Sequence, residues 1–227
     1  DESLYAAEAL LRIHDKNGKF ISPAEAIPIL EESGLIIPVG KWIIQNAFSM
    51  CTECRKYYPE FRVSINLSYV QILKSPLMME LKQMIEHSGI SCSGIIVELT
   101  ESGYLEGTPA VRSVWNDMKQ LRIQIALDDF GTGYSNLMNI SNLEPDIVKL
   151  DRGFTLKALS RSYEYQLMQY VIEMVHKLNQ YVCVEGVETK EDLERIKALG
   201  PDLIQGYYYS KPCSRDEFLK KFFGYSE

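Results

Sequence analysis

IQIALDD, at residues 123–129, is a short apolar run that ends in two adjacent acids. Runs of this length and character are typical of strands in a parallel sheet that is covered on both faces. Six more lie along the chain, and the seven predicted strands are Ala6 to Ile13, Val63 to Leu67, Ile95 to Thr100, Ile123 to Asp129, Ile147 to Asp151, Val182 to Val187 and Leu203 to Tyr208.

Amphipathic segments separate these runs, as expected for parallel strands joined by helical crossovers. Several helix starts are marked chemically, because a capping serine or threonine followed by a first-turn proline favours a helix. Glu25 completes a capping-box pattern with Ser22, and Glu217 completes one with Ser214. The Ser-Pro and Thr-Pro pairs are Ser22-Pro23, Ser75-Pro76 and Thr108-Pro109.

The longest helical pattern carries a stripe of apolar residues at helical spacing. We expect that stripe to pack against the sheet and to serve the core, not a ligand. Its members are Leu167, Tyr170, Val171, Met174 and Leu178.

The alternation of strands and helices predicts an α/β fold, a TIM-like (β/α)8 barrel in one domain over residues 1–227. No linker, charge block or low-complexity tract divides the chain. Seven strands, however, do not close an eight-stranded barrel. We therefore expect that a first strand is missing from this fragment, or that this end of the barrel is unusual.

The composition is that of a globular protein, with 46% hydrophobic and 24% charged residues and no apolar run long enough to cross a bilayer. The net charge of −7 disfavours binding to a nucleic acid polymer, because phosphates would be repelled. No signal peptide opens the chain, so the cytoplasm is the expected compartment, although segments outside this sequence could tether the domain to a membrane protein.

The five cysteines are odd in number and favour reduced thiols over a disulfide framework. Cys51 and Cys54 form a C-x-x-C inside a helical pattern, but no second Cys or His pair stands at a zinc-like distance. We interpret both thiols as structural, not as metal-binding or redox-active.

Nearly every predicted strand carries an ionisable or amide residue at or near its carboxyl end. In a barrel these ends form a ring, so residues far apart in sequence converge on one mouth. The set consists of Glu8, Asn66, Glu98, Asp128, Asp129, Lys149, Asp151, Glu185 and Gln205.

Convergence of so many acids has an electrostatic consequence. Like charges at short range raise one another's pKa, and Lys149 is the one cation in the set. Divalent cations would resolve the conflict, and carboxylate and amide oxygens suit Mg²⁺ or Mn²⁺ better than zinc. A bound metal would also let an anionic phosphodiester approach an acidic protein.

Each member of the set also has a plainer interpretation. A single acid at a strand end is usually a helix cap or a loop residue, and Asn66 could be a turn residue. Lys149 and Glu185 shift the balance, because they lie in or directly after apolar strands, where an unpaired charge is costly. Adjacent side chains of a strand point to opposite faces, so Asp128 and Asp129 can serve one site only if the backbone bends between them.

The motifs around these residues resemble those of the EAL family of cyclic di-GMP phosphodiesterases over essentially the whole chain. They are EALLR at 8–12, NLS at 66–68, ELTES at 98–102, DDFGTGYSNL at 128–137, KLD at 149–151, EGVET at 185–189 and QGYYYSKP at 205–212. The family's Y-Q-P-I-like strand has no match before Glu8, while Ala6 replaces a common glycine and Ile13 a common tryptophan.

The resemblance implies a barrel with one antiparallel strand and hydrolysis of cyclic di-GMP to linear pGpG by a metal-activated water, with two Mg²⁺ or Mn²⁺ ions. By similarity, one ion would be held by Glu8, Asn66, Glu98 and Asp128, and the second by Asp128 and Asp129. Glu185 would act as base or water ligand with the help of Lys149, and Asp129 would share in catalysis. The implied substrate-side residues are Leu10, Arg12, Asp151, Glu188 and Gln205.

The resemblance also implies a setting for the domain. Glu101 matches the family's anchor for the glycine loop after Asp129, a loop that lies near a dimer contact in relatives, so a homodimer is expected. Fusion to a sensory or GGDEF-type domain is expected as well. Two alternatives stay open: a catalytically silent cyclic di-GMP receptor or protein-interaction module on the same fold, and a magnesium-dependent barrel enzyme that forms an enolate.

Overall fold

The structure, a computed structural model, describes residues 3–100, 108–132, 140 and 143–224. The described chain forms two compact units. The first contains the residues up to Glu98, those of 108–123 and those from Arg215 on, and the second contains Leu99, Thr100 and the residues of 124–214. The prediction of one domain over residues 1–227 stays a prediction.

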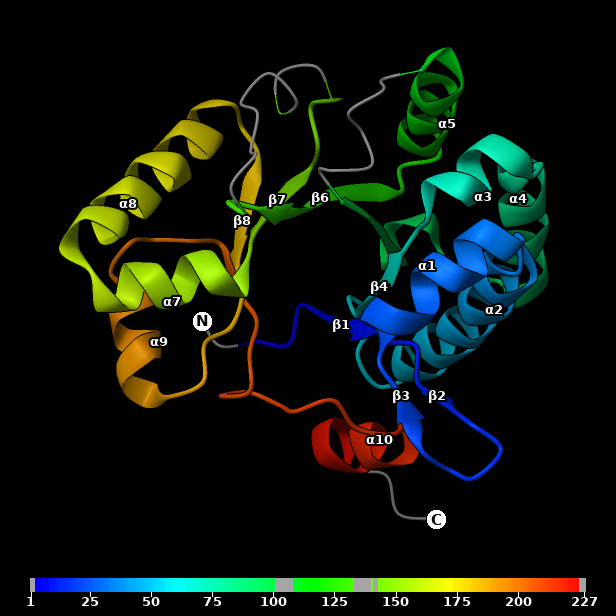
Figure 1. The fold of residues 1–227 in the computed structure, drawn as a ribbon, viewed down its shortest axis with the longest axis horizontal. Helices are drawn as coiled ribbons and strands as arrows, with labels where there is room; N and C mark the ends of the chain where they lie inside the picture. The colour runs from blue at the N-terminus through cyan, green and yellow to red at the C-terminus, as the bar shows by residue number, and fades with distance from the viewer. Residues whose placement is uncertain (1–2, 101–107, 133–139, 141–142, 225–227) are drawn as a thin grey trace. The chain divides into compact units, whose positions relative to one another are not determined.

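The first unit is built on three neighbouring parallel strands, β1 (Ala6–Ala9), β4 (Arg62–Asn66) and β5 (Ile95–Thr100), of which β5 extends two residues into the second unit. Figure 1 shows α1 to α4 gathered on one side of these strands. The helices are α1 (Pro23–Ser33), α2 (Ile36–Cys54), α3 (Tyr69–Lys74), α4 (Leu77–Ser88), α5 (Pro109–Gln120) and α10 (Arg215–Phe223), with one 3-10 turn, η1 (Cys92–Gly94).

A small cavity between strands and helices shows which strand face is covered in the first unit. It is lined by Ile65 and Val97 from the strands, by Ile44 from α2 and by Met118 from α5. Side chains alternate along a strand, so the odd-numbered residues of β4 and β5 face the helices. The even-numbered residues face the other way. Asn66, the last residue of β4, also borders the cavity, but its side-chain amide reaches Glu8.

The second unit has four neighbouring parallel strands, β6 (Gln124–Phe130), β7 (Ile147–Leu150), β8 (Tyr181–Val184) and β9 (Leu203–Ile204). In Figure 1, α7 (Arg152–Ser160), α8 (Ser162–Lys177) and α9 (Lys190–Lys197) lie on the same side of β7 and β8. All four residues of β7 are buried, which confirms the expectation of strands covered on both faces.

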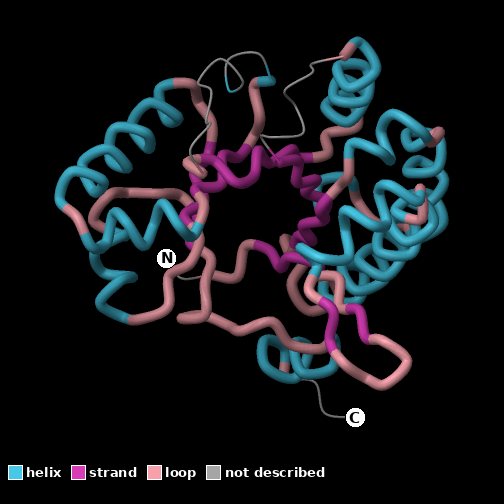
Figure 2. The backbone as a smooth tube through the Cα atoms, viewed as in Figure 1, coloured by secondary structure: helices cyan, strands magenta, loops and turns pink. Residues whose placement is uncertain are grey.

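All seven predicted strands are present, with boundaries that differ at most ends. The first ends at Ala9, four residues before the predicted Ile13, and the chain then forms an antiparallel hairpin, β2 (Ile13–His14) with β3 (Phe20–Ile21). Figure 2 shows this hairpin as two short strands in the first unit. The strand pairings described within the main sheet of each unit are parallel. Among the described residues, antiparallel pairing is found in the separate hairpin.

The predicted helix starts hold in three of four places. Thr108 caps α5 by accepting a hydrogen bond from Val111 N, and α10 begins at Arg215. Ser22 stands at the N-cap of α1 but makes no side-chain cap hydrogen bond. Ser75 was wrongly predicted to cap a helix: its Oγ donates to Gln71 O at 2.7 Å and closes α3, while Pro76 precedes α4.

The prediction that an apolar stripe of α8 packs inward is wrong for three of its five residues, while Val171 and Met174 are half-buried. Leu167, Tyr170 and Leu178 are 42%, 65% and 48% exposed. The buried face of α8 is instead formed by Met168, Ile172 and Val175. The predicted stripe and the buried stripe both have helical spacing, and each buried residue directly follows a predicted one in the sequence. Periodicity alone therefore could not decide which stripe faces the sheet.

Candidate active site

In the first unit, a group of polar side chains lies on the strand face that points away from the helices. Glu8 is in register with Ser64, and Asn66 is in register with Glu98. Residues in register on parallel strands point to one side, and Ser64 and Asn66 are two residues apart. All four side chains therefore share a face. We call Glu8, Ser64, Asn66 and Glu98 the acid–amide group.

Hydrogen bonds orient both carboxylates of the acid–amide group. Nδ2 of Asn66 donates to Oε1 of Glu8 at 2.7 Å. The hydroxyl of Ser64 donates to Oε1 of Glu98, and both residues are buried, with 5% and 3% exposure. Three predicted metal ligands from three strands are thus brought to one place within the first unit.

In the second unit, Lys149 joins two of the predicted acids. Its Nζ lies 2.8 Å from Oε1 of Glu185 and 3.3 Å from Oδ1 of Asp128. Lys149 is 3% exposed, so the ammonium is removed from water and its charge is balanced by these carboxylates. We call Asp128, Lys149 and Glu185 the lysine group.

The backbone bend expected at the paired acids is present. The pairing of β6 with β7 shifts between Leu127 and Phe130, which marks a bulge, and Asp129 has φ +60°. Aspartate is one of the few residues other than glycine that tolerate this left-handed conformation. The bend re-aims one acid relative to the other, as a shared site would require.

Two of the predicted substrate-side residues have structural partners. Oδ1 of Asp151 accepts hydrogen bonds from Gly153 N at 2.7 Å and Phe154 N at 3.3 Å, so this acid caps α7. Glu188 accepts a hydrogen bond from Arg152 at 2.8 Å. Neither observation tests a contact with substrate, which stays a prediction for both acids.

The other predicted substrate-side residues lie near strand ends. Gln205 follows β9, and its backbone N donates to Val184 O at 2.9 Å. Leu10 and Arg12 follow β1 and are exposed, and Nη1 of Arg12 donates to Leu11 O. Glu101 and residues 133–137 of the glycine-containing motif lie outside the described residues.

The acid–amide group is the candidate site for a divalent ion in the first unit. Within the described residues of either unit, no three Asp, Glu, His or Cys side chains are grouped so as to hold a metal ion. The acid–amide group nevertheless offers hard oxygen donors from three adjacent strands, two carboxylates and an amide, which is the chemistry that Mg²⁺ and Mn²⁺ prefer. The residues present fit such an ion.

Two residues near these groups were not identified from the sequence. Ser64 was hidden inside the predicted strand, where the one available signal is a hydroxyl between apolar residues. Arg152 stands directly after the KLD motif, where the sequence pattern assigned it no role. Their roles depend on contacts with neighbouring segments, which single-sequence patterns do not show.

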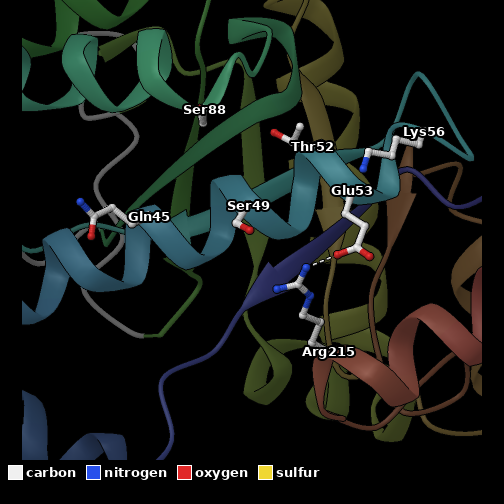
Figure 3. Close-up of a pocket in the computed structure, with 7 residues that line it drawn as sticks. All are labelled: Gln45, Ser49, Thr52, Glu53, Lys56, Ser88 and Arg215. Atoms are coloured by element: carbon white, nitrogen blue, oxygen red, sulfur yellow. Dashed lines mark hydrogen bonds and ion pairs between the residues drawn. The ribbon is translucent and has the colours of Figure 1, made fainter. Parts of the chain in front are cut away.

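A separate hollow of about 420 Å³ lies in the first unit, and it contains none of the predicted site residues. Figure 3 shows that most of its lining comes from α2. Arg215 forms an ion pair there with Glu53. The lining residues are Gln45, Ser49, Thr52, Glu53, Lys56, Ser88 and Arg215.

The C-x-x-C thiols lie in the core of the first unit. Cys51 and Cys54 are fully buried and free. Burial raises the pKa of Cys51 to about 11 and that of Cys54 to about 12. Thiols held protonated in this way are poor nucleophiles and poor metal ligands, in keeping with the structural interpretation.

None of the described helices is both long and apolar enough to cross a bilayer.

Comparison with known proteins gives concordant matches. A family model described as EAL domain matches residues 1–212. Cyclic di-GMP phosphodiesterase PdeF of Escherichia coli (strain K12) is 32% identical over 205 residues, which are 90% of this chain and 27% of that protein. This chain spans between 25% and 32% of the length of eight curated relatives that it matches.

Solved structures agree with the sequence matches. The EAL enzyme Bd1971, in its form bound to cAMP and cyclic di-GMP, aligns with a TM-score of 0.90 and 30% identity over 96% of this chain and 60% of that one. The PaMucR phosphodiesterase in complex with c-di-GMP gives a TM-score of 0.86 and 27% identity, over 93% of this chain and 86% of that one. The predicted fold class, a (β/α)8 barrel of this type, is thereby confirmed.

Proposed function

The chain belongs to the EAL domain family, and from that premise we propose that it hydrolyses cyclic di-GMP to linear pGpG with the help of divalent metal ions. The observation that carries this proposal is the acid–amide group, in which Glu8, Asn66 and Glu98 share one strand face in the first unit. These are the positions at which the family's motifs place metal ligands.

The metal would be Mg²⁺ or Mn²⁺. We propose that Glu8, Asn66, Glu98 and Asp128 hold one ion, and that Asp128 and Asp129 hold a second. When bound, such ions lower the pKa of a water molecule and stabilise the charge that develops on the entering and leaving oxygens of the phosphodiester. The hydrogen bond from Asn66 supports this role, because it fixes the direction of the Glu8 carboxylate before any ion arrives.

The protein's own groups supply the remaining chemistry. Glu185 is proposed to accept the proton of the attacking water, as general base. The ammonium of Lys149, 2.8 Å from Glu185, holds this carboxylate in place. Arg12 is exposed and carries a fork of donors that suits phosphate oxygens, so we assign it to the substrate phosphate. Leu10, Asp151, Glu188 and Gln205 are proposed to line the same mouth.

The decisive experiment combines turnover with metal binding. The purified chain is incubated with cyclic di-GMP and Mg²⁺ or Mn²⁺ beside Glu8→Ala, Glu185→Ala and the control Glu194→Ala, whose side chain is exposed on α9. We expect the parent and the control to form pGpG, and both site variants to lose about 10³-fold or more in kcat. Metal should raise the melting temperature of the parent and of Glu185→Ala, and not that of Glu8→Ala.

A catalytically silent receptor is the competing function. It would bind cyclic di-GMP with no release of pGpG at any concentration of Mg²⁺ or Mn²⁺, so a parent that binds without turnover would replace the phosphodiesterase proposal. A parent with no affinity for cyclic di-GMP would remove both.

The domain's setting is proposed on less direct grounds. Because the chain spans at most about a third of its curated relatives, we propose that it is one domain of a longer signalling protein that also carries a sensory or GGDEF-type domain. A homodimer and a cytoplasmic location stay predictions from the sequence.

A further inference from the structure

The loop from Glu185 to Glu188 joins β8 to α9 and carries the acid that the proposed function uses as a base. Backbone hydrogen bonds hold the loop at two points. Glu185 N donates to Leu150 O at 3.1 Å, and Val187 N donates to Gln205 O at 3.3 Å. Val187 is fully buried, so the middle of the loop is packed into the second unit.

Arg152, the first residue of α7, lies directly against this loop. A Cβ atom added to Gly186 would stand 2.3 Å from Cγ and 2.8 Å from Cβ of Arg152, distances that no real side chain adopts. Gly186 also has φ +78°, a conformation that favours glycine. The loop thus has a glycine at the point where the arginine stem crosses it.

The guanidinium of Arg152 continues past Gly186 to the end of the loop. Its Nη2 and Nε donate to Oε1 of Glu188 at 2.8 and 3.2 Å. At the other end of the loop, Lys149 holds Glu185. Two cations three residues apart, Lys149 in β7 and Arg152 at the start of α7, therefore bind the two acids at the ends of one loop.

A helix cap holds the backbone between these two cations in place. Asp151 lies between the gripping residues and caps α7 through Gly153 N and Phe154 N. A capped helix end restricts the backbone on which Arg152 stands, so the arginine acts from a rigid base.

We propose that Arg152 is a positioning residue, which clamps the loop from Glu185 to Glu188 so that Glu185 keeps its place beside Lys149. The catalytic consequence rests on the function proposed above, whereas the clamp is a property of the fold. Arg152 contacts the loop at Gly186 and at Glu188, so we propose that its effect on the reaction passes through the loop.

The first test separates turnover from binding. We expect Arg152→Ala to lower kcat by about ten-fold and to leave KM within about two-fold, because a small displacement of a catalytic group costs turnover. Arg152→Lys should restore part of the loss, since lysine keeps the charge but not the fork of donors. Arg161→Ala is the matched control: it removes an ion pair of similar length and exposure, with Glu164, from the same unit and should leave kcat unchanged.

A double-mutant cycle identifies the partner. If Arg152 acts through Glu188, the variant with both residues changed to Ala should be no slower than the slower of the two single variants. Fully additive losses would overturn the proposal. An unchanged kcat in Arg152→Ala would also overturn it, because a clamp that keeps Glu185 in place must affect turnover.

A measurement without substrate keeps the clamp testable whatever the reaction proves to be. Hydrogen exchange at the Val187 amide should become about two- to five-fold faster in Arg152→Ala, the change expected for loss of an exposed ion pair that restrains a loop. In Arg161→Ala it should not change. Exchange at Val187 that is unaffected by Arg152→Ala would overturn the clamp, while a parent inactive on cyclic di-GMP would overturn the proposed function alone.

Discussion

The acid–amide group and the lysine group orient their carboxylates by different means. In the first unit, Glu8 and Glu98 accept hydrogen bonds from an amide and a hydroxyl, which carry no charge. In the second, Asp128 and Glu185 share one ammonium. A neutral donor fixes the direction of a carboxylate and leaves its charge in place, whereas lysine also balances that charge.

This difference in donors bears on the roles proposed for the acids of the two groups. Glu8 and Glu98, two of the proposed metal ligands, are oriented by neutral donors and keep their full charge for a cation. Asp128, also a proposed ligand, differs from them because it lies beside Lys149. Asp128 and Glu185 are both close to one ammonium, so Lys149 offsets the repulsion between these acids. The comparison teaches that each unit orients its acids through contacts between neighbouring strands.

Removal of the shared ammonium should have the largest effect. Lys149→Met leaves Asp128 and Glu185 with reduced compensation at 13% and 18% side-chain exposure, and we expect the free energy of unfolding to fall by about 3–5 kcal/mol. Urea denaturation measures the change. Asn66→Leu, which removes a neutral donor from an exposed position, should cost about 1 kcal/mol. Equal losses in the two variants would erase the distinction between the groups.

A smaller effect is expected from the hydroxyl in the acid–amide group. Ser64→Ala removes the donor to a buried carboxylate, so the free energy of unfolding should fall by about 1–3 kcal/mol in the metal-free protein. The exposed Ser91→Ala serves as control and should change little. A fully stable Ser64→Ala would show that Glu98 needs no orienting donor.

Thiol labelling compares the units with no substitution at all. Cys51 in the first unit and Cys183 in the second are buried, whereas Cys213 is exposed. At pH 8 a thiol reagent should modify Cys213 at least about 100-fold faster than Cys51, because burial both blocks access and raises the pKa of Cys51 to about 11. The labelling rates of Cys51 and Cys183 then report how often each unit opens. Rapid modification of Cys51 in the native protein would contradict the packing of α2.

Much of the fold could be predicted because the strands are simple. Strands that are buried on both faces are short, nearly continuous apolar runs in the sequence, and all seven predicted strands are present. The stripe on α8 was misplaced because that helix is apolar around much of its circumference, so burial is decided by tertiary packing. The β2–β3 hairpin escaped notice because its strands have two residues each, too few for a period to appear.

The candidate site was predictable to the extent that its residues stand at strand ends. The bend at Asp129 followed from the alternation of side chains along a strand and is present. Ser64 and Arg152 were missed because each matters through a partner more than 30 residues away, Glu98 and Glu188. Such contacts depend on strand register and on the packing of a loop, which one sequence does not reveal.

The left-handed backbone at Asp129 also limits which residues can replace this aspartate without strain. Glycine and asparagine tolerate that conformation as well as aspartate does, and a single base change in an aspartate codon reaches either one. Each would keep the bulge in β6 and discard a carboxylate. One base change is therefore enough to give a protein that keeps the backbone of β6 and loses the carboxylate at position 129.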